Sequence, residues 1–334
     1  MLYITTRNTD DAYTSYRALM NDCGPDGGAF VPFRIPVLTN SRFTQMKEKT
    51  FNENVADILN LFFSTQLTGW DLDFGIGRNL LRISTVHRRV AVAELWHNLE
   101  DNYDYIECIL FRKITKDEGT NVTKWPRIAI RIAVMFGIYG QLLREEELHV
   151  GEHFDISVCN DDFVSPMAAL YCRKMGMPVN TVICACDEAK NLWDFIHRGF
   201  INTANINEDM QFGIERLLHL TLGYKTAVEF SANCEQKRTF TIEQKDLPQL
   251  NEALFCSVSG KARAQTVINS LYRTNTYIID DDAARSYGGL QDYRAKVGDS
   301  QLTVIFAEKT PLNCLNEIMT ATGLNEAVIM KHIN

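Results

Sequence analysis

Residues 154–199 read FDISVCNDDFVSPMAALYCRKMGMPVNTVICACDEAKNLWDFIHRG. Two short runs rich in β-branched residues alternate here with two longer runs whose apolar residues recur at helical spacing. We therefore predict strands over 154–158 and 181–186 and helices over 163–175 and 191–200. Strands that alternate with helices of this length are typical of an α/β fold, in which helices cover both faces of a mainly parallel sheet.

The sequence on either side extends this pattern. The further predicted elements are, in chain order, a strand at 2–6, helices at 12–20 and 52–64, a strand at 90–95, helices at 103–114, 125–143 and 262–273, strands at 277–279 and 302–306, and a helix after Pro311. Ligands of parallel α/β sheets bind beyond the carboxyl ends of the strands. We predict those ends at Cys159-Asn160, Asp187 and Ala307-Glu308, and we expect a binding site there.

The composition argues against two classes of partner. The chain has 34 Lys and Arg against 42 Asp and Glu, a formal net charge of −8. Nucleic acids and anionic membrane surfaces are bound by clustered positive charge, so we expect neither as a partner. The longest apolar stretch, 128–143, is interrupted by Arg131 and is too short to span a bilayer comfortably, which predicts a buried helix.

The start of the chain and its cysteines favour a cytoplasmic protein. No basic start followed by an apolar run opens the sequence, as it would in a signal peptide. The nine cysteines are scattered and odd in number, which does not suggest a disulfide framework. Cys184 and Cys186 lack the Cys-x-x-Cys spacing of redox and zinc pairs. We expect both to lie on one face of a strand as small buried groups.

Seven short segments occur in the same order in one enzyme family. They are Tyr3-Ile4-Thr5-Thr6-Arg7, Gly24-Pro25-Asp26-Gly27-Gly28, Glu94-Leu95-Trp96-His97, Trp125-Pro126-Arg127, Lys174-Met175-Gly176-Met177-Pro178, Glu215-Arg216-Leu217-Leu218 and Tyr277-Ile278-Ile279-Asp280. These segments resemble motifs of the threonine synthases, which are fold-type-II pyridoxal phosphate enzymes. The resemblance implies the large parallel-sheet domain of that fold, which is similar to the β subunit of tryptophan synthase.

The resemblance also implies a division of the chain. Residues 1–88 correspond to the N-terminal region of the family and residues 89–334 to its α/β domain. Family members carry a small mobile domain between the helix of the imine-forming lysine and the next conserved helix. Here only 125 − 104 = 21 positions separate Asp104 from Trp125. We therefore expect the small domain to be reduced or deleted between about 105 and 124.

The position of the imine-forming lysine holds an aspartate. The family motif reads E-L-F-H-G-P-T-x-x-F-K-D, and counting from Glu94 places Asp104 at the lysine. An imine with the cofactor needs a primary amine, and a carboxylate cannot form it. Lys113 and Lys116 lie roughly 13–18 Å farther along the same predicted helix, at ~1.5 Å per residue, so neither replaces the lost amine.

The segment that matches the phosphate-binding loop has lost its glycines. The family reads S-G-N-F-G-[ND], and the corresponding residues are Asn160, Asp161, Asp162, Phe163, Val164 and Ser165. Glycines let main-chain N–H groups wrap a phosphate dianion. Asp161 and Val164 replace them, and each acidic side chain would repel a dianion by on the order of 1 kcal/mol at 4 Å even in water. We expect the two aspartates to act as N-cap residues of the following helix instead.

Glu308 stands where the family has the hydroxyl residue that meets the cofactor's ring nitrogen. The resemblance places it in a vestigial cleft with five further residues. The predicted lining is His97, Tyr103, Asp104, Asp161, Asp162 and Glu308. A hydrogen-bonded structural role is expected for His97 in particular.

Two acidic clusters could in principle bind metal, and we predict that neither does. His149 and His153 have helical spacing, but Gly151 lies between them and is expected to end the helix. The segment 280–282 consists of three aspartates, for which turn or N-cap roles are expected.

These departures predict a threonine-synthase-like pseudoenzyme without pyridoxal phosphate or metal, acting as a binding, regulatory or interaction protein. Its partner would be an unknown protein or a second copy of the chain. Two alternatives remain open at this point. The first is a repurposed enzyme that uses the acidic cleft, and the second is residual binding of an amino-acid-like ligand.

Overall fold

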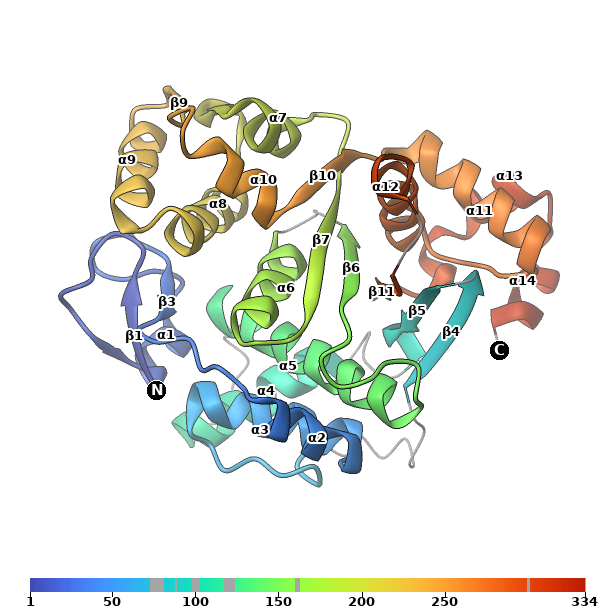
Figure 1. Ribbon diagram of the computed structural model, residues 1–334, viewed down its shortest axis with the longest axis horizontal. Coiled ribbons are helices and arrows are strands. Elements are labelled where there is room, and N and C mark those ends of the chain that lie inside the picture. The colour runs from blue at the N-terminus through green and yellow to red at the C-terminus, as the bar shows by residue number, and fades with distance from the viewer. Residues whose placement is uncertain are drawn as a thin grey trace.

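The two strands of segment 154–199 lie side by side near the centre of a six-stranded sheet (Figure 1). In this computed structural model, the described residues are 1–72, 81–87, 89–97, 102–116, 124–159, 163–298 and 301–333. The strand order is β10 (Phe255–Val258), β7 (Val179–Cys186), β6 (Phe154–Cys159), β11 (Thr303–Ala307), β5 (Val90–Glu94) and β4 (Arg82–His87). All neighbours pair in parallel except β4, which pairs antiparallel with β5 at the edge. The predicted α/β fold with a mainly parallel sheet is confirmed.

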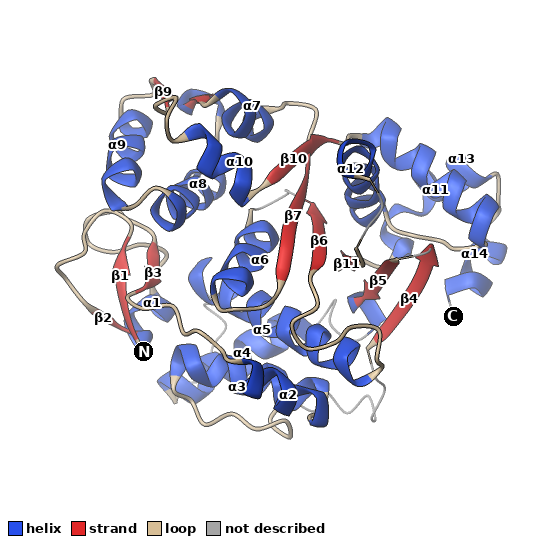
Figure 2. Ribbon diagram, in the orientation of Figure 1, coloured by secondary structure: helices blue, strands red, loops and turns tan. Residues whose placement is uncertain are grey.

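Helices cover both faces of this sheet (Figure 2). One face is covered by α5 (Lys124–Arg144) and α6 (Val164–Lys174), and the other by α11 (Lys261–Asn275) and α12 (Asp281–Val297). The alternation of side chains along β7 separates the two layers. Cys184 belongs to the core cluster that contains α5 and α6, whereas Ile183 belongs to the cluster that contains α11 and α12.

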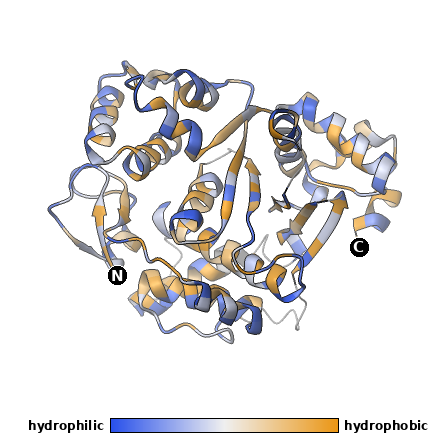
Figure 3. Ribbon diagram, viewed as in Figure 1, coloured by the Kyte–Doolittle hydropathy of each residue, from blue (hydrophilic) through white to orange (hydrophobic). Residues whose placement is uncertain are grey.

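The long apolar helix is the centre of the larger core. Of the helices in the described ranges, α5 alone is long and apolar enough to cross a membrane, but 89% of its most apolar stretch is buried inside the protein. It packs on α3 (Phe51–Phe63) closely enough that a Cβ at Gly137 would lie 2.7 Å from the ring of Phe51. Both helices carry much of the apolar colour in Figure 3. The prediction of a buried helix is confirmed.

The remaining elements surround this centre. At the N-terminus, β1 (Leu2–Thr5) pairs with β2 (Tyr13–Thr14) and β3 (Phe30–Pro32) in a separate antiparallel sheet. The other helices and short strands are α1 (Ser15–Met20), α2 (Asn40–Glu48), η1 (Leu95–His97), α4 (Asn102–Thr115), α7 (Asn191–Arg198), β8 (Phe200–Asn202), η2 (Thr203–Asn205), α8 (Glu208–Thr221), α9 (Tyr224–Glu235), β9 (Thr239–Thr241), α10 (Leu247–Ala253), η3 (Pro311–Cys314), α13 (Leu315–Thr322) and α14 (Glu326–Ile333).

Three predicted boundaries differ from the structure. The helix expected from residue 12 begins at Ser15, because Tyr13 and Thr14 pair with β1 as β2. Residues 277–279 form a loop rather than a strand, and the apolar character of Ile278 and Ile279 reflects burial in the core under α12. The helix predicted over 125–143 ends at Arg144, seven positions before Gly151, so Gly151 does not end it as expected. The division at 88 and 89 and the loss of a small domain remain predictions.

Candidate functional site

The carboxyl ends of the central strands bring four polar side chains together. Glu308 follows β11, Ser165 lies in the first turn of α6, Arg131 comes from the middle of α5 and Tyr103 from the first turn of α4. Glu308 accepts hydrogen bonds from Arg131 Nη2 at 3.0 Å and from Ser165 Oγ at 2.9 Å. The Arg131 guanidinium lies 4.7 Å from the centre of the Tyr103 ring. We call these four residues the Glu308 cluster.

The Glu308 cluster is largely shielded from solvent. The side chain of Arg131 is 16% exposed and that of Glu308 is 25% exposed. Arg131 Nε also points to Glu308 Oε1, at 3.4 Å, so the guanidinium meets both carboxylate oxygens. Such two-point pairing fixes the geometry of both partners as well as adding energy. A rigid, internally paired carboxylate is a poor acceptor for anything that enters from outside.

The structure describes only some of the residues that were predicted to line the cleft. Tyr103 and Glu308 belong to one cluster, as expected. Asp161 and Asp162, like Asn160, lie outside the described residues, and residue 104 lies within α4 while its side chain is outside the described part. The acidic lining predicted for the cleft therefore remains a prediction.

His97 belongs to a different network. Its Nε2 lies 2.9 Å from Glu94 Oε2, and its ring stacks on Trp96. Glu94 is 2% exposed and also accepts a hydrogen bond from the Tyr277 hydroxyl at 2.9 Å. Burial, together with the charge of Glu94, raises the pKa of Tyr277, so this phenol stays protonated and donates. His97 is thus hydrogen-bonded, as expected, but to Glu94 and not within the cluster of Tyr103 and Glu308.

The start of α6 is formed by Phe163. It is the N-cap residue, with φ of +58°, and its side chain caps no N–H group. Phe163 thus occupies the N-cap position expected for the two aspartates, and capping by the side chain of Asp161 or Asp162, which lie outside the described residues, remains a prediction. Phe163 is held in this conformation by packing, since a Cβ at Gly213 of α8 would lie 2.5 Å from its ring. Val164 and Ser165 form the first helical positions, and Ser165 uses its hydroxyl for Glu308.

Two lysines that follow position 104 in the sequence have carboxylate partners in other parts of the chain. Lys113 Nζ lies 2.8 Å from Asp71 Oδ1. Lys124 Nζ lies 2.8 Å from Glu208 Oε2 and 3.1 Å from Asp209 Oδ1. Lys116 is exposed at the end of α4. The expectation that neither Lys113 nor Lys116 forms the imine stays a prediction.

The two clusters weighed as metal sites have structural partners. Asp280 is the N-cap residue of α12 and accepts from the main-chain N–H groups of Asp282 and Ala283, both at 3.0 Å. Asp282 forms an ion pair with Lys309. At the other cluster, Glu152 accepts from the main-chain N–H of His149 at 3.0 Å. The N-cap role expected within 280–282 is confirmed.

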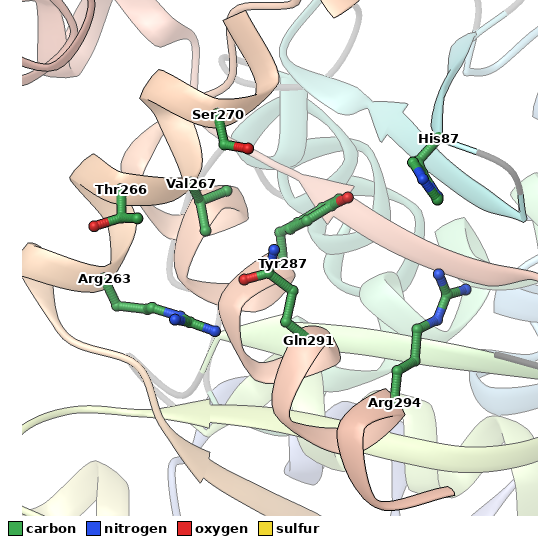
Figure 4. A pocket seen from close by; sticks show the side chains of 8 residues that line it. All are labelled: His87, Arg263, Thr266, Val267, Ser270, Tyr287, Gln291 and Arg294. Carbon is green, nitrogen blue, oxygen red and sulfur yellow. The ribbon is translucent and has the colours of Figure 1, made fainter. Parts of the chain in front are cut away.

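A separate cavity of about 580 Å³ lies between α11, α12 and the end of β4 (Figure 4). Its lining is His87, Arg263, Thr266, Val267, Ser270, Tyr287, Gln291 and Arg294. No residue of the predicted cleft lines it. This cavity was not predicted from the sequence, because three of its residues come from α12, which was not predicted, and the others from α11 and β4.

Comparisons with known proteins agree with the resemblance. The family model of the threonine synthase N terminus matches residues 2–78. Threonine synthase-like 1 of Pongo abelii is 24% identical over 196 residues, which cover 55% of this chain and 26% of that protein. The Homo sapiens protein of the same name is 24% identical over 188 residues, or 51% of this chain and 25% of that protein. The chain thus spans about a quarter of the length of these curated relatives.

Solved structures show the same fold. Pyridoxal phosphate-bound threonine synthase from Brucella melitensis superposes with a TM-score of 0.79 at 15% identity, covering 100% of this chain and 94% of that one. Threonine synthase from yeast gives a TM-score of 0.79 at 14% identity, covering 100% and 92%. The chain therefore has the fold of the threonine synthases, and its residues 2–78 match the model of the threonine synthase N terminus.

Proposed function

We propose that this chain is a pseudoenzyme of the threonine synthase family, which forms no imine with pyridoxal phosphate and acts as a binding or regulatory protein. The observation that carries the proposal is the pairing of Glu308 with Arg131 and Ser165. Glu308 stands at the position matched to the residue that meets the cofactor's ring nitrogen. A pyridine ring would have to displace Arg131 or Ser165 before it could reach this carboxylate.

The proposal is also supported by the residues at the positions matched to the imine-forming lysine and to the phosphate-binding loop. Residue 104, at the matched lysine position, is an aspartate. Lys113 and Lys124 are held by carboxylates of other elements. At the matched phosphate loop, α6 begins with Val164 in place of a glycine and with Phe163 packed under α8. The described residues therefore do not fit the cofactor, and we derive no chemical step through it.

The direct test is incubation of the whole protein with pyridoxal phosphate, followed by borohydride reduction, dialysis and peptide mapping. The yeast threonine synthase serves as the positive control. We expect no stoichiometric imine absorbance and only scattered, substoichiometric labelling of exposed lysines. A one-to-one yellow complex whose label maps to a single lysine would contradict the proposal.

A second test asks whether the Glu308 cluster stabilises the fold, as we expect if Glu308 forms a structural ion pair. Glu308→Gln removes the charge that pairs with Arg131, and we expect it to lower the free energy of unfolding by about 1–3 kcal/mol, the range for a charge-assisted hydrogen bond. Urea unfolding measures this, and Glu317→Gln, at an exposed position of α13, is the matched control.

The same experiment separates the proposal from the alternative of a repurposed enzyme. Catalytic carboxylates are often held at a cost to stability, so their replacement can stabilise a protein. An increase in stability for Glu308→Gln would favour an active acidic cleft over a structural ion pair. Residual amino-acid binding is tested by a thermal-shift screen with amino acids, because a bound ligand raises the unfolding temperature.

A further inference from the structure

Three buried cysteines meet on one face of the central sheet. Cys184 and Cys186 are two residues apart on β7, so their side chains point to the same face. Cys256 of β10 lies directly beside Cys184 in the parallel register. The three Sγ atoms all lie within 4.8 Å of one another, and the residues are 0%, 0% and 1% exposed. The burial expected for Cys184 and Cys186 is confirmed, and Cys256 adds a third sulfur.

The spacing of the sulfurs suits a single soft metal ion. A metal–thiolate bond is about 2.3 Å long, so three sulfurs around one ion lie about 4 Å apart. The three Sγ atoms lie within 4.8 Å of one another, so their separations exceed this value by no more than about 1 Å. Soft thiolate ligands select Cu(I), Zn(II) or iron–sulfur clusters. Structural zinc takes four ligands, whereas this group has three members among the His, Cys, Asp and Glu of the described chain.

We propose that Cys184, Cys186 and Cys256 form a three-sulfur site for Cu(I), a soft monovalent ion that accepts three thiolate ligands. Binding forms Cu–S bonds at the expense of S–H bonds, and the released protons pass to water. No oxidation state changes in this step. The site is independent of the Glu308 cluster and of the proposed function, so each can fail without the other.

The sulfurs of the cluster also interact with one another. Hydrogen bonds from the Cys184 and Cys256 thiols lower the pKa of Cys186 in spite of its burial, whereas burial raises the pKa of Cys184 and Cys256. The assignment of a three-sulfur site follows from the positions of the Sγ atoms, all within 4.8 Å of one another.

An ion can reach the cluster over a short path. Cys186 is the last residue of β7, and residues 187–190 after it are exposed. The strand end faces the loop that leads into α7, whose buried residues Leu192 and Phe195 cover the same core. Entry therefore requires local opening of this loop rather than disruption of the sheet.

The test is an anaerobic titration of the full chain with Cu(I) in competition with a chromogenic Cu(I) chelator. We expect one tightly bound ion per chain and, by X-ray absorption, three sulfur ligands. Cys184→Ala and Cys256→Ala should each weaken binding by at least about 100-fold, more than the loss of an outer-shell partner causes. Cys314→Ala, which removes a buried cysteine of η3, should leave binding unchanged.

A second measurement supports this test. Cu(I) should raise the unfolding temperature of the unmodified protein, a readout that does not depend on how well the variants fold. The proposal is wrong if the unmodified protein binds no Cu(I) tightly, if the Cys184 and Cys256 variants bind as tightly as their parent, or if Zn(II) is retained in preference to Cu(I).

Discussion

Replacement of Glu215 by alanine is expected to lower the free energy of unfolding by about 3–5 kcal/mol, the cost of leaving one partner of a buried ion pair behind. Glu215 lies in α8 and is fully buried. Its carboxylate accepts hydrogen bonds from Arg7 Nη2 and from Thr6 Oγ1, both at 2.8 Å. The Arg7 side chain is only 13% exposed, so the variant removes the buried carboxylate of a largely buried guanidinium and leaves it the exposed Glu235, 3.2 Å from Nη1.

Urea unfolding followed by circular dichroism measures this loss. Glu229→Ala, at an exposed position of α9, is the matched control and should change stability by no more than about 0.5 kcal/mol. Glu215→Gln keeps the shape but not the charge and should fall between the two. A loss below about 1 kcal/mol for Glu215→Ala would show that the existing ion pair of Arg7 with Glu235, at 3.2 Å, compensates for the lost carboxylate.

This ion pair gives a structural reason for the presence of two of the family-like segments. Arg7 closes the first segment and Glu215 opens the sixth, yet the two residues are 208 positions apart. The ion pair links the end of the N-terminal sheet, formed by β1, β2 and β3, to α8. The sheet and α8 lie next to each other in Figure 1. These residues therefore stabilise the fold, and their presence does not argue for threonine synthase activity.

The fold was predictable where the local sequence carries its own periodicity. The elements of 154–199 and the helix at 124–144 were predicted to within about two residues at most boundaries, because β-branched runs and helical spacing are local signals. The four-residue β10 and the helix α12 were missed. β10 is a strand because β7 lies beside it. The helical pattern in the sequence of α12 is interrupted by Gly288 and Gly289, which pack against Ser259 and Ala185 in the continuous helix.

The candidate site was predictable only in part, because local sequence patterns do not specify contacts between residues that are far apart in the chain. Alignment with family motifs identified Glu308, Ser165 and Tyr103, and the structure brings all three together. Arg131 was missed as a site residue, although it stood out as the one charge inside an apolar run. Its partner Glu308 is 177 positions away, and no local pattern specifies a pairing over that distance.

The stability of the protein should depend on pH through Asp280. This carboxyl is 1% exposed, and burial raises its pKa to about 8, with the charges of Asp282 and Asp281 acting in the same direction. The hydrogen bonds from the main-chain N–H groups of Asp282 and Ala283 oppose this shift but do not cancel it. Asp280 Oδ2 has no hydrogen-bond partner within the described chain, consistent with a carboxyl that is neutral at pH 7.

The direction in which stability changes with pH follows from proton linkage. The unfolded chain ionises Asp280 near pH 4 and the folded chain near pH 8, so the folded state binds more protons between these values. The stability contributed by the protonated form is complete below about pH 4 and is lost as the pH rises towards 8. Asparagine keeps the oxygen that caps α12 but cannot ionise. Asp280→Asn should therefore be more stable than its parent at pH 8, by on the order of 5 kcal/mol.

Urea unfolding of both proteins at intervals from pH 4 to 9 tests this expectation. The two stability curves should meet near pH 4 and separate steadily above it. Asp281→Asn, the same change one residue along the first turn of α12, should follow the parent far more closely. Parallel curves for Asp280→Asn and the parent would mean that Asp280 is ionised in the folded protein, so that the main-chain N–H groups at the start of α12 outweigh the cost of burying its charge.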